Sequence, residues 1–233
     1  MYDALNPWGP SDAYYLDLIA SVDSALDLAC GTGQLLRRAA GDTETATLVG
    51  VDLSAAMLAE AARTPTRVVW RRGDARTVDL GSSFELVVMT GHAFQEFLTD
   101  DDVLALLANV RRHLVPGGRF AFETRNPAAK AWEQWTPERS RRTVSAPTGE
   151  LVEIAHGPVE LIEPDVVEFP TTCRFKGSSS SLEIRGGLRF MHPEHLRTLL
   201  VSSGFRIDGW FGDWSRTPVT TSSPEVVVVA SPV

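Results

Sequence analysis

The chain has 233 residues, 43% of them hydrophobic and 22% charged, a composition typical of a globular protein with one sizeable domain and a full core. Its formal net charge of −8 argues against nucleic acid or an anionic membrane as the main partner, and no apolar run reaches membrane-spanning length. The sequence begins without a basic and apolar leader, so we expect a cytoplasmic protein. Its Cys30 and Cys173 should then stay reduced, and because they lack metal-ligand spacing we expect no metal site.

Strands and helices are predicted to alternate along the first half of the chain. After an irregular arm over 1–10, Ser11-Asp12 is expected to cap a first helix. Strands that are apolar on both faces and alternate with helices form a parallel sheet covered on both sides. The buried strands are expected at 25–29, 47–53, 67–70, 85–89 and 119–123, and the helices between them at 34–40, 55–63 and 100–114.

The composition changes after Asn126-Pro127, where hairpin signals replace helices. A short helix near 128–135 is expected to lead into an antiparallel segment, and a helix and two antiparallel strands are expected to complete the chain. The expected elements are strands at 151–156, 166–175 and 182–190 with a turn at 178–181, then a helix at 193–203 and strands at 205–211 and 225–230.

The predicted fold class is therefore α/β. It is a doubly wound, mostly parallel seven-stranded sheet with an antiparallel last strand, plus an antiparallel β insert after strand five. We divide the chain into a Rossmann-like core with an N-terminal arm (1–126), the insert (127–190) and the remainder of the core sheet (191–233).

A strand, a glycine turn and the start of a helix are combined in Leu26–Gly33, which reads LDLACGTG. Glycines let the backbone turn sharply and approach a ligand, and ligands of doubly wound sheets bind at the carboxyl ends of strands, where the strand order reverses. Asp52 ends the next strand, about twenty residues later, where an acid accepts hydrogen bonds from ribose hydroxyls. These two features suit NAD and S-adenosylmethionine equally well.

Three other positions favour S-adenosylmethionine. A dinucleotide site wants a third glycine where Leu36 stands. The Asp27 carboxylate would repel a pyrophosphate but can accept hydrogen bonds from the ammonium of an amino-acid tail. Gly73-Asp74-Ala75, after strand three, offers a side-chain acceptor beside backbone donors for an adenine edge, although a simple turn explains the same composition.

With the LDLACGTG, GVDLS, RRGDA, FELVVMTGHAF and LVPGGRFAFETRNP segments in this order, the chain resembles the class I (Rossmann-like) S-adenosylmethionine-dependent methyltransferases over about 200 residues. Ala29-Cys30 departs from the commonest pattern, which has glycine in the loop. The resemblance implies S-adenosylmethionine as cofactor and S-adenosylhomocysteine as product. The cofactor-binding residues that it implies are Asp27, Ala29, Gly31, Gly33, Asp52, Leu53, Met57, Gly73, Asp74, Ala75, Thr90 and Gly91.

Candidate catalytic residues follow the strand ends. His92 comes after strand four and is a candidate general base, and Glu123 and Arg125 end strand five, where they are placed to bind or orient a polar substrate. Ion pairing at a strand end is the plainer interpretation of Glu123 and Arg125. A sulfonium is a good leaving group, so alignment can supply most of the rate and no base is obligatory. The expected substrate-binding residues are Tyr14, Tyr15, His92, Phe94, Arg125 and His156.

The acceptor is expected to be a small molecule. Thr90-Gly91-His92-Ala93 stands where nucleobase- and protein-methylating branches of the family have an Asn/Asp-Pro-Pro-aromatic tetrapeptide. The insert resembles the lid or pocket wall of small-molecule methyltransferases. We therefore predict an enzyme that methylates an oxygen or nitrogen of a small molecule and exists as a monomer or homodimer. The alternatives are an NAD(P)-dependent oxidoreductase and a non-catalytic protein that binds S-adenosylmethionine.

Overall fold

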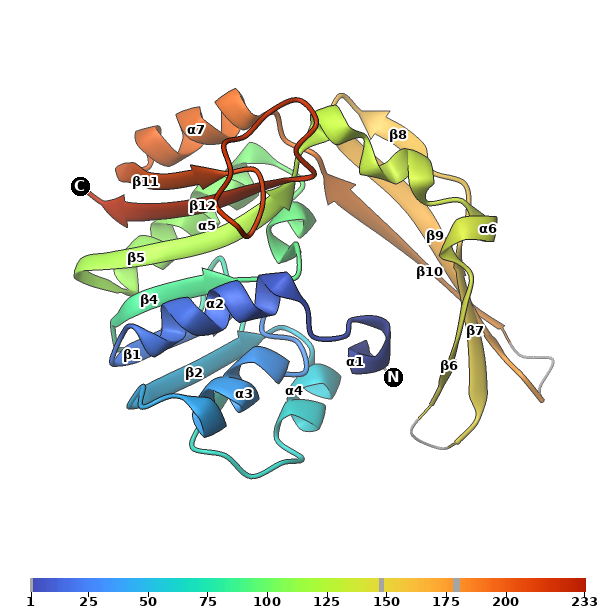
Figure 1. Cartoon of the computed structure of the whole chain (residues 1–233), viewed down its shortest axis with the longest axis horizontal. Helices are drawn as coiled ribbons and strands as arrows, with labels where there is room; N and C mark the ends of the chain where they lie inside the picture. Colours follow the sequence, from blue (N-terminus) through green and yellow to red (C-terminus); the bar gives the residue numbers. More distant parts are fainter. Residues whose placement is uncertain (1, 147–148, 178–180) are drawn as a thin grey trace.

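Two β-sheets dominate the molecule, a large one with helices on both faces and a smaller antiparallel one beside it (Figure 1). The structure is a computed structural model that describes residues 2–146, 149–177 and 181–233, so most of the turn expected at 178–181 lies outside the described residues. The N-terminal segment lies between the two sheets in this view.

The large sheet is built from seven strands: β1 (Ser24–Leu28), β2 (Thr47–Asp52), β3 (Val69–Arg72), β4 (Phe84–Met89), β5 (Leu114–Arg125), β11 (Phe205–Phe211) and β12 (Glu225–Pro232). Their spatial order is β11-β12-β5-β4-β1-β2-β3. β1 pairs in parallel with both β2 and β4, whereas β12 is antiparallel to both β5 and β11. The predicted fold class is confirmed, and the strand order reverses between β1 and β4.

Helices cover both faces of this sheet because its strands are apolar on both sides. Leu26, Val87 and Phe120 belong to a cluster that includes α5 and α7, while Ala25 and Leu86, one residue earlier on their strands, belong to a cluster with α2 and α3. The helices are α1 (Tyr2–Leu5), α2 (Pro10–Ala20), α3 (Gln34–Asp42), α4 (Ala55–Ala61), α5 (Asp100–Arg112), α6 (Pro137–Ser140) and α7 (Pro193–Ser202), with 3₁₀ turns η1 (Ala93–Glu96), η2 (Pro127–Ala129) and η3 (Ala131–Gln134).

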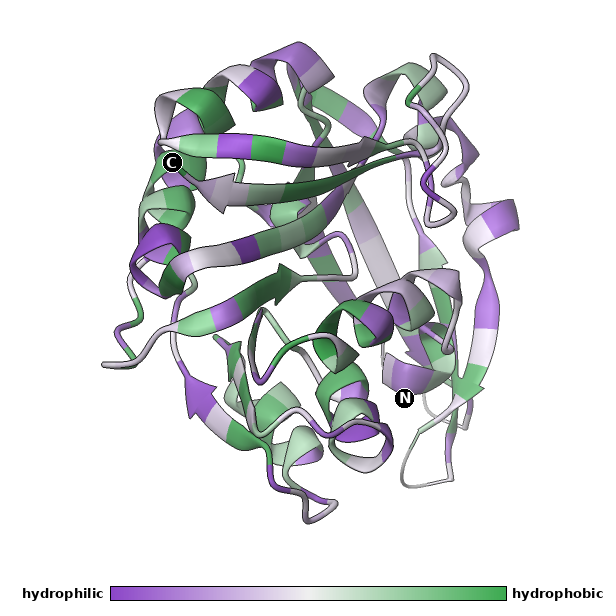
Figure 2. Cartoon of the chain, turned by 60° about the vertical axis from the view of Figure 1, so that its left-hand side comes forward, coloured by the Kyte–Doolittle hydropathy of each residue, from purple (hydrophilic) through white to green (hydrophobic). Residues whose placement is uncertain are grey.

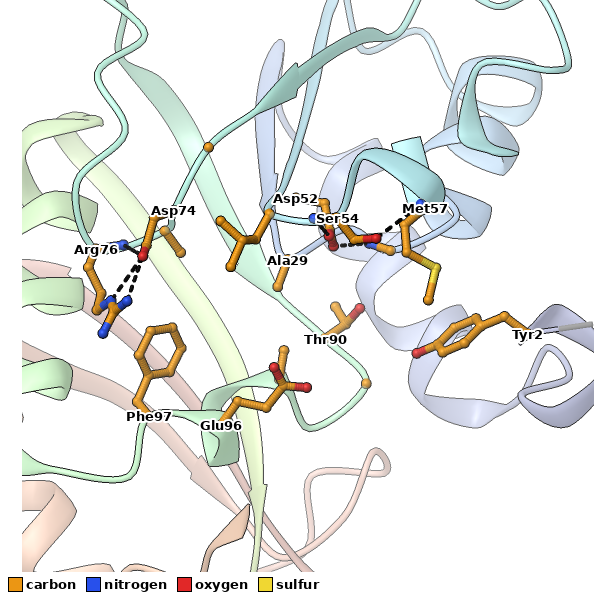
Figure 3. A pocket seen from close by; sticks show the side chains of 16 residues that line it. Tyr2, Ala29, Asp52, Ser54, Met57, Asp74, Arg76, Thr90, Glu96 and Phe97 are labelled. Atoms are coloured by element: carbon orange, nitrogen blue, oxygen red, sulfur yellow. Dashed lines mark hydrogen bonds and ion pairs between the residues drawn. The ribbon is translucent and has the colours of Figure 1, made fainter. Parts of the chain in front are cut away.

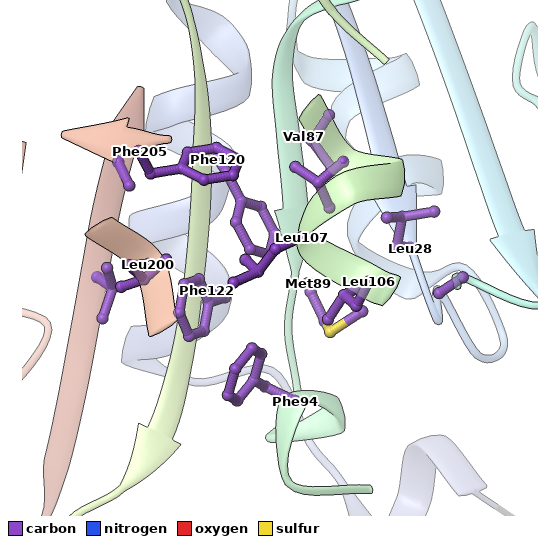
Figure 4. Close-up of a cluster of buried hydrophobic side chains, with 14 of the residues drawn as sticks. Leu28, Val87, Met89, Phe94, Leu106, Leu107, Phe120, Phe122, Leu200 and Phe205 are labelled. Atoms are coloured by element: carbon purple, nitrogen blue, oxygen red, sulfur yellow. The ribbon is translucent and has the colours of Figure 1, made fainter. Parts of the chain in front are cut away.

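Aromatic side chains fill the centre of the α5 and α7 face (Figure 4). Phe120 and Phe122 are fully buried and stack with ring centroids 4.7 Å apart. Each buried phenyl ring contributes about 1.5–3 kcal/mol of transfer free energy. The hydropathy colouring shows the apolar strands running through the middle of the sheet (Figure 2). Within the described residues, no helix is both long and apolar enough to cross a membrane.

The smaller sheet is inserted between β5 and α7. It contains β6 (Arg142–Ser145), β7 (Leu151–His156), β8 (Glu160–Glu163), β9 (Val166–Phe175) and β10 (Ser181–Arg189). The order is β10-β9-β7-β6, with β8 also paired to β9, and all of these pairs are antiparallel, as predicted. β6 and β8 were not predicted, because both are four residues long and largely exposed, so neither shows a clear hydrophobic alternation.

The structure corrects three local predictions. The arm over 1–10 contains the short helix α1. α2 begins at Pro10 rather than after a Ser11-Asp12 cap, since Pro favours the first helical position and the Asp12 carboxylate accepts a hydrogen bond from Gly9 N at 2.8 Å. The expected helix near 128–135 is instead the two 3₁₀ turns η2 and η3, separated by Lys130 in a left-handed conformation with φ 45°.

Candidate functional site

Two adjoining cavities open at the carboxyl ends of β1 to β4, around the point where the strand order reverses. The larger cavity has a volume of about 560 Å³ and is seen from close by in Figure 3. The smaller cavity, of about 390 Å³, extends from it toward the end of β5 and the start of β6. The two share the lining residues Tyr2, Ala29, Gly31, Thr90 and Gly91.

The loops after β1 and β4 place several residues in the left-handed region of backbone conformation. φ is 60° at Ala29, 55° at Gly31 and 71° at Gly33 in the first loop, and 67° at Gly91 and 62° at His92 in the second. Glycine tolerates this region, whereas Ala29 and His92 each cost about 1–2 kcal/mol there. Strained residues in both loops facing the strand reversal mark this edge of the sheet as a candidate functional site.

Gly33 is the N-cap residue of α3, and it is not among the described residues that line the two cavities. A Cβ atom at Gly33 would overlap the ring of Trp70 on β3, and one at Gly50 would come within 2.5 Å of the same ring. The indole therefore packs over two glycines. Gly33 serves the site through its backbone conformation and through this packing, rather than by forming a wall.

Asp27 is the most constrained acid of the site. Its side chain is 1% exposed at the end of β1, where it lines the smaller cavity. Within the described chain, its Oδ1 atom has no hydrogen-bond partner. Burial raises the pKa of Asp27 well above its usual range, and the nearby charges of Asp52 and Glu123 raise it further. This environment repels phosphate groups and suits a cationic ammonium group.

Asp52 is held in place by backbone hydrogen bonds from two loops. Its Oδ2 atom accepts from Gly31 N at 2.8 Å, and its Oδ1 atom accepts from Ser54 N at 2.7 Å. Each carboxylate oxygen has a second lone pair, so the group can still accept hydrogen bonds from a ligand. The predicted cofactor residues that line the larger cavity beside Asp52 are Ala29, Gly31, Leu53, Met57, Gly73, Asp74, Ala75, Thr90 and Gly91.

Asp74 has a side-chain partner that the sequence did not reveal. The Arg76 guanidinium lies 2.6 Å from one carboxylate oxygen of Asp74 and also bonds Asp102, and it lines the larger cavity with Asp74. These hydrogen bonds lower the pKa of Asp74 below its usual value. Figure 3 shows the pair at the opposite side of the view from Tyr2, with Asp52 between them. Arg76 is a lining residue that was not predicted, and it competes with an adenine edge for the Asp74 carboxylate.

Tyr2 and Glu96 also line the larger cavity and were not predicted to do so. Tyr2 comes from α1, and its side chain borders both cavities. Glu96 ends η1, and burial, together with the charge of Asp52, raises its pKa. Figure 3 shows Glu96 and Tyr2 facing the space below Thr90. The sequence signal for Tyr2 is weak, because an isolated four-residue helix has no hydrophobic periodicity.

His92 and Glu123, both predicted to be catalytic, meet in one hydrogen-bonded network beside the smaller cavity. One Glu123 oxygen accepts from His92 N at 2.7 Å, and the other accepts from the Tyr15 hydroxyl. His92 Nε2 lies 3.0 Å from Glu225 Oε2 on β12. Burial raises the pKa of Glu123, which is 1% exposed. The carboxylate of Glu123 therefore holds the loop after β4 in place.

Arg125, the third predicted catalytic residue, also lines the smaller cavity. Its Nη1 donates to Gln95 Oε1 at 2.8 Å, and its guanidinium carbon lies 5.2 Å from the centre of the Trp135 ring. Burial lowers the pKa of Arg125, while the charges of Glu225 and Glu123 oppose that effect. Gln95 was not predicted, since a buried glutamine has no sequence pattern of its own.

The other predicted substrate-binding residues lie outside both cavities. Tyr14 and Tyr15 are buried with their rings 5.3 Å apart, although Tyr15 reaches the network through Glu123. Phe94 is 2% exposed and stacks on a core phenylalanine at 4.3 Å. His156 lies on β7 of the insert, where its Nδ1 atom is 3.0 Å from the hydroxyl of Thr171. These four side chains lie outside the cavities because they pack against or bond residues that are distant in the sequence, which the spacing of residues does not reveal.

The residues present fit S-adenosylmethionine. The unpartnered oxygen of Asp27 suits its ammonium group, and Asp52 has lone pairs to spare for ribose hydroxyls. Leu53 and Met57 supply apolar surface at the larger cavity, whose volume lies within the roughly 300–1,000 Å³ common for small-molecule sites. A dinucleotide fits less well, because a pyrophosphate at this loop would lie near a buried acid.

Residues 25–118 match a family model described as a methyltransferase domain. The sequence is 33% identical over 132 residues to a dTDP-4-amino-2,3,4,6-tetradeoxy-D-glucose N,N-dimethyltransferase of Saccharopolyspora spinosa, a match covering 53% of this chain and 52% of the relative. The match thus spans about half the length of that relative. A 2-phytyl-1,4-naphtoquinone methyltransferase of Thermosynechococcus vestitus is 29% identical over 185 residues, covering 73% of this chain and 80% of the relative.

The fold also matches solved structures over nearly its whole length. An S-adenosylmethionine-dependent methyltransferase from Clostridium acetobutylicum superposes with a TM-score of 0.77 at 17% identity, covering 99% of this chain and 96% of that chain. At this identity the likeness concerns the fold. It includes the inserted sheet as well as the seven-stranded core, because the coverage is almost complete.

Proposed function

We propose that the chain is a class I S-adenosylmethionine-dependent methyltransferase and transfers a methyl group from S-adenosylmethionine to an oxygen or nitrogen of a small molecule. The observation that carries the proposal is the buried Asp27 near the carboxyl end of β1, whose Oδ1 has no partner among the described residues. A carboxylate is retained in such a place at a cost in stability, and the binding of a cationic ligand offsets that cost.

When bound, S-adenosylmethionine supplies an electrophilic methyl group whose carbon–sulfur bond breaks with both electrons passing to sulfur, leaving a neutral thioether. In the proposed site, Asp27 binds the ammonium end of the cofactor and Asp52 binds its ribose. The loop after β4, held by Glu123, presents Thr90 and Gly91 to both cavities and His92 to the smaller one. The chain thereby contributes mainly proximity and orientation, which can be worth roughly 10⁵–10⁸ M in effective concentration.

His92 is the residue that we assign to proton removal from the acceptor. If Nε2 carries the hydrogen and donates it to the Glu225 carboxylate, Nδ1 keeps a lone pair. Nδ1 makes no hydrogen bond within the described part of the chain, and His92 borders the smaller cavity. A general base contributes roughly 10²–10⁴ in rate when the nucleophile must lose a proton.

The insert over 127–190 is proposed to form one wall of the acceptor site, with 1–126 and 191–233 forming the cofactor-binding core. Arg142, the first residue of β6, lines the smaller cavity together with Arg125 at the end of β5. A pocket of about 390 Å³ suits a small acceptor better than a polymer. The sugar dimethyltransferase of Saccharopolyspora spinosa supports a small acceptor by its name.

Two measurements test the proposal. Isothermal titration with S-adenosylhomocysteine and with NADH should give binding only for the former, and Asp52→Ala should weaken it about 10-fold or more through the lost ribose contacts. Incubation with methyl-labelled S-adenosylmethionine and a panel of amines, phenols and carboxylic acids should then give a labelled product. Binding of the cofactor without transfer to any acceptor would favour a non-catalytic S-adenosylmethionine-binding protein.

A further inference from the structure

Arg125 is a half-buried cation in the wall of the smaller cavity. Among the described residues, no carboxylate oxygen lies within 4.0 Å of its guanidinium, whereas ion pairs of that kind occur at many other arginines of the chain. Burial lowers the pKa of Arg125, but a guanidinium stays protonated in proteins. The side chain therefore keeps a desolvated positive charge that faces the smaller cavity.

The two nearest acids are committed elsewhere. Glu225 lies directly across from Arg125 in the β12–β5 pairing, yet its carboxylate contacts His92 Nε2 at 3.0 Å. Glu123 is two residues before Arg125 on β5, and its two oxygens accept hydrogen bonds from Tyr15 and from His92 N. The hydrogen bonds of the network around His92 hold both carboxylates out of direct contact with the guanidinium, and their remaining effect on Arg125 is a longer-range attraction that raises its pKa.

Neutral groups fix the guanidinium instead. Gln95 is fully buried, accepts from Arg125 Nη1 at 2.8 Å, and is itself anchored because its Nε2 donates to Arg189 O at 2.9 Å. The Trp135 ring lies beneath the guanidinium carbon at 5.2 Å. One hydrogen bond engages one of the five N–H donors of Arg125 within the described chain, so the planar fork is oriented with most of its donors unused.

We propose that Arg125 is the anion-binding group of the acceptor site, and that the methyl acceptor therefore carries a carboxylate or phosphate group. A fixed planar guanidinium binds either group with two parallel hydrogen bonds. Arg142 lies in the wall of the same cavity and adds a second positive charge from the insert. This inference rests on the proposed methyltransferase function and names its class of acceptor.

The test uses the full chain saturated with S-adenosylhomocysteine and two probe anions, tricarballylate for carboxylates and inorganic diphosphate for phosphates. Isothermal titration should detect binding of one of them, and its identity tells which chemistry the acceptor carries. Arg125→Gln should weaken that binding about 10-fold or more, and Arg125→Lys should weaken it less because the charge remains. Arg141→Gln is the matched control, since Arg141 pairs with Glu153 and lines neither cavity.

The proposal is overturned if neither anion binds, or if both Arg125 variants bind the anion as the wild-type chain does. It is also overturned if Arg125→Gln weakens S-adenosylhomocysteine binding as much as anion binding, because the guanidinium would then serve the carboxylate of the cofactor. Failure of the wild-type chain to bind S-adenosylhomocysteine would instead count against the proposed function. Arg125→Lys keeps the comparison available if Arg125→Gln does not fold.

Discussion

Replacing Asp27 with asparagine should change the stability of the ligand-free protein and its affinity for the cofactor in opposite directions. The substitution keeps the shape of the side chain and removes its charge, at a position that is 1% exposed and has an oxygen without a partner among the described residues. We expect Asp27→Asn to stabilise the ligand-free protein and to weaken cofactor binding at the same time. The two effects have opposite signs because the carboxylate is uncompensated until a cation binds.

The expected magnitudes follow from the burial. An unsatisfied buried group costs more when it is charged than when it is neutral, so replacing the carboxylate by an amide should raise the midpoint of thermal unfolding by a few degrees, at about 2–4 °C per kcal/mol for a chain of this size. A charge-assisted hydrogen bond is worth about 1.5–3 kcal/mol, so the Kd for S-adenosylhomocysteine should rise about 10- to 100-fold. Asp17→Asn is the control, because Asp17 is exposed on α2 and lines neither cavity.

The gain in stability should depend on pH with a definite sign. Burial, then the charges of Asp52 and Glu123, raise the folded-state pKa of Asp27 above the unfolded value of about 3.9. The folded protein then holds this proton more tightly than the unfolded chain does, so the wild type loses stability as the pH rises from about 3.9 through the folded-state pKa. The difference between Asp27→Asn and the wild type should therefore be small near pH 4 and larger at neutral pH.

Differential scanning fluorimetry of the ligand-free proteins across pH, and isothermal titration with S-adenosylhomocysteine at neutral pH, measure both effects. A variant that unfolds at a lower temperature than the wild type at neutral pH, or that binds the cofactor unchanged, would refute the reasoning. The first result would mean that Asp27 is satisfied in the protein, and the second that it does not face the cofactor.

Two further pairs of substitutions test the framework of the site. Gly33→Ala should lower the free energy of unfolding by about 2–4 kcal/mol, because the new Cβ adds left-handed backbone strain and overlaps the Trp70 ring. Adding Trp70→Leu should recover the part due to the overlap, and a double-mutant cycle in denaturant that shows full recovery or none would contradict this division. Glu225→Gln should lower kcat about 10-fold or more and leave the Kd for S-adenosylhomocysteine unchanged, because Glu225 positions the imidazole of His92. In a His92→Asn background the same substitution should have no further effect on kcat. Additive effects would show that Glu225 does not act through His92.

The sequence was sufficient to predict the seven-stranded sheet, because strands apolar on both faces alternate with amphipathic helices over most of the chain. It also pointed to the edge of the sheet where the cavities open, since glycines after β1 and an acid at the end of β2 are local features of adjacent strand ends. The short strands β6 and β8 were missed because four exposed residues carry no periodic signal.

Only the tertiary structure decided how the side chains of the site are paired. Sequence spacing placed Glu123 and Arg125 at one strand end, where an ion pair was the plain expectation, but Glu123 instead accepts hydrogen bonds from Tyr15 on α2 and from His92 N in the loop after β4. Arg76 pairs with Asp74, its near neighbour in the sequence, and also with Asp102 on α5. The pairings with Tyr15, His92 and Asp102 join residues far apart in the chain, and they depend on distances of a few ångströms that local patterns do not encode. The glycine loop could therefore be predicted from the sequence, whereas the lack of an ion-pair partner for Arg125 among the described residues became visible only in the folded chain.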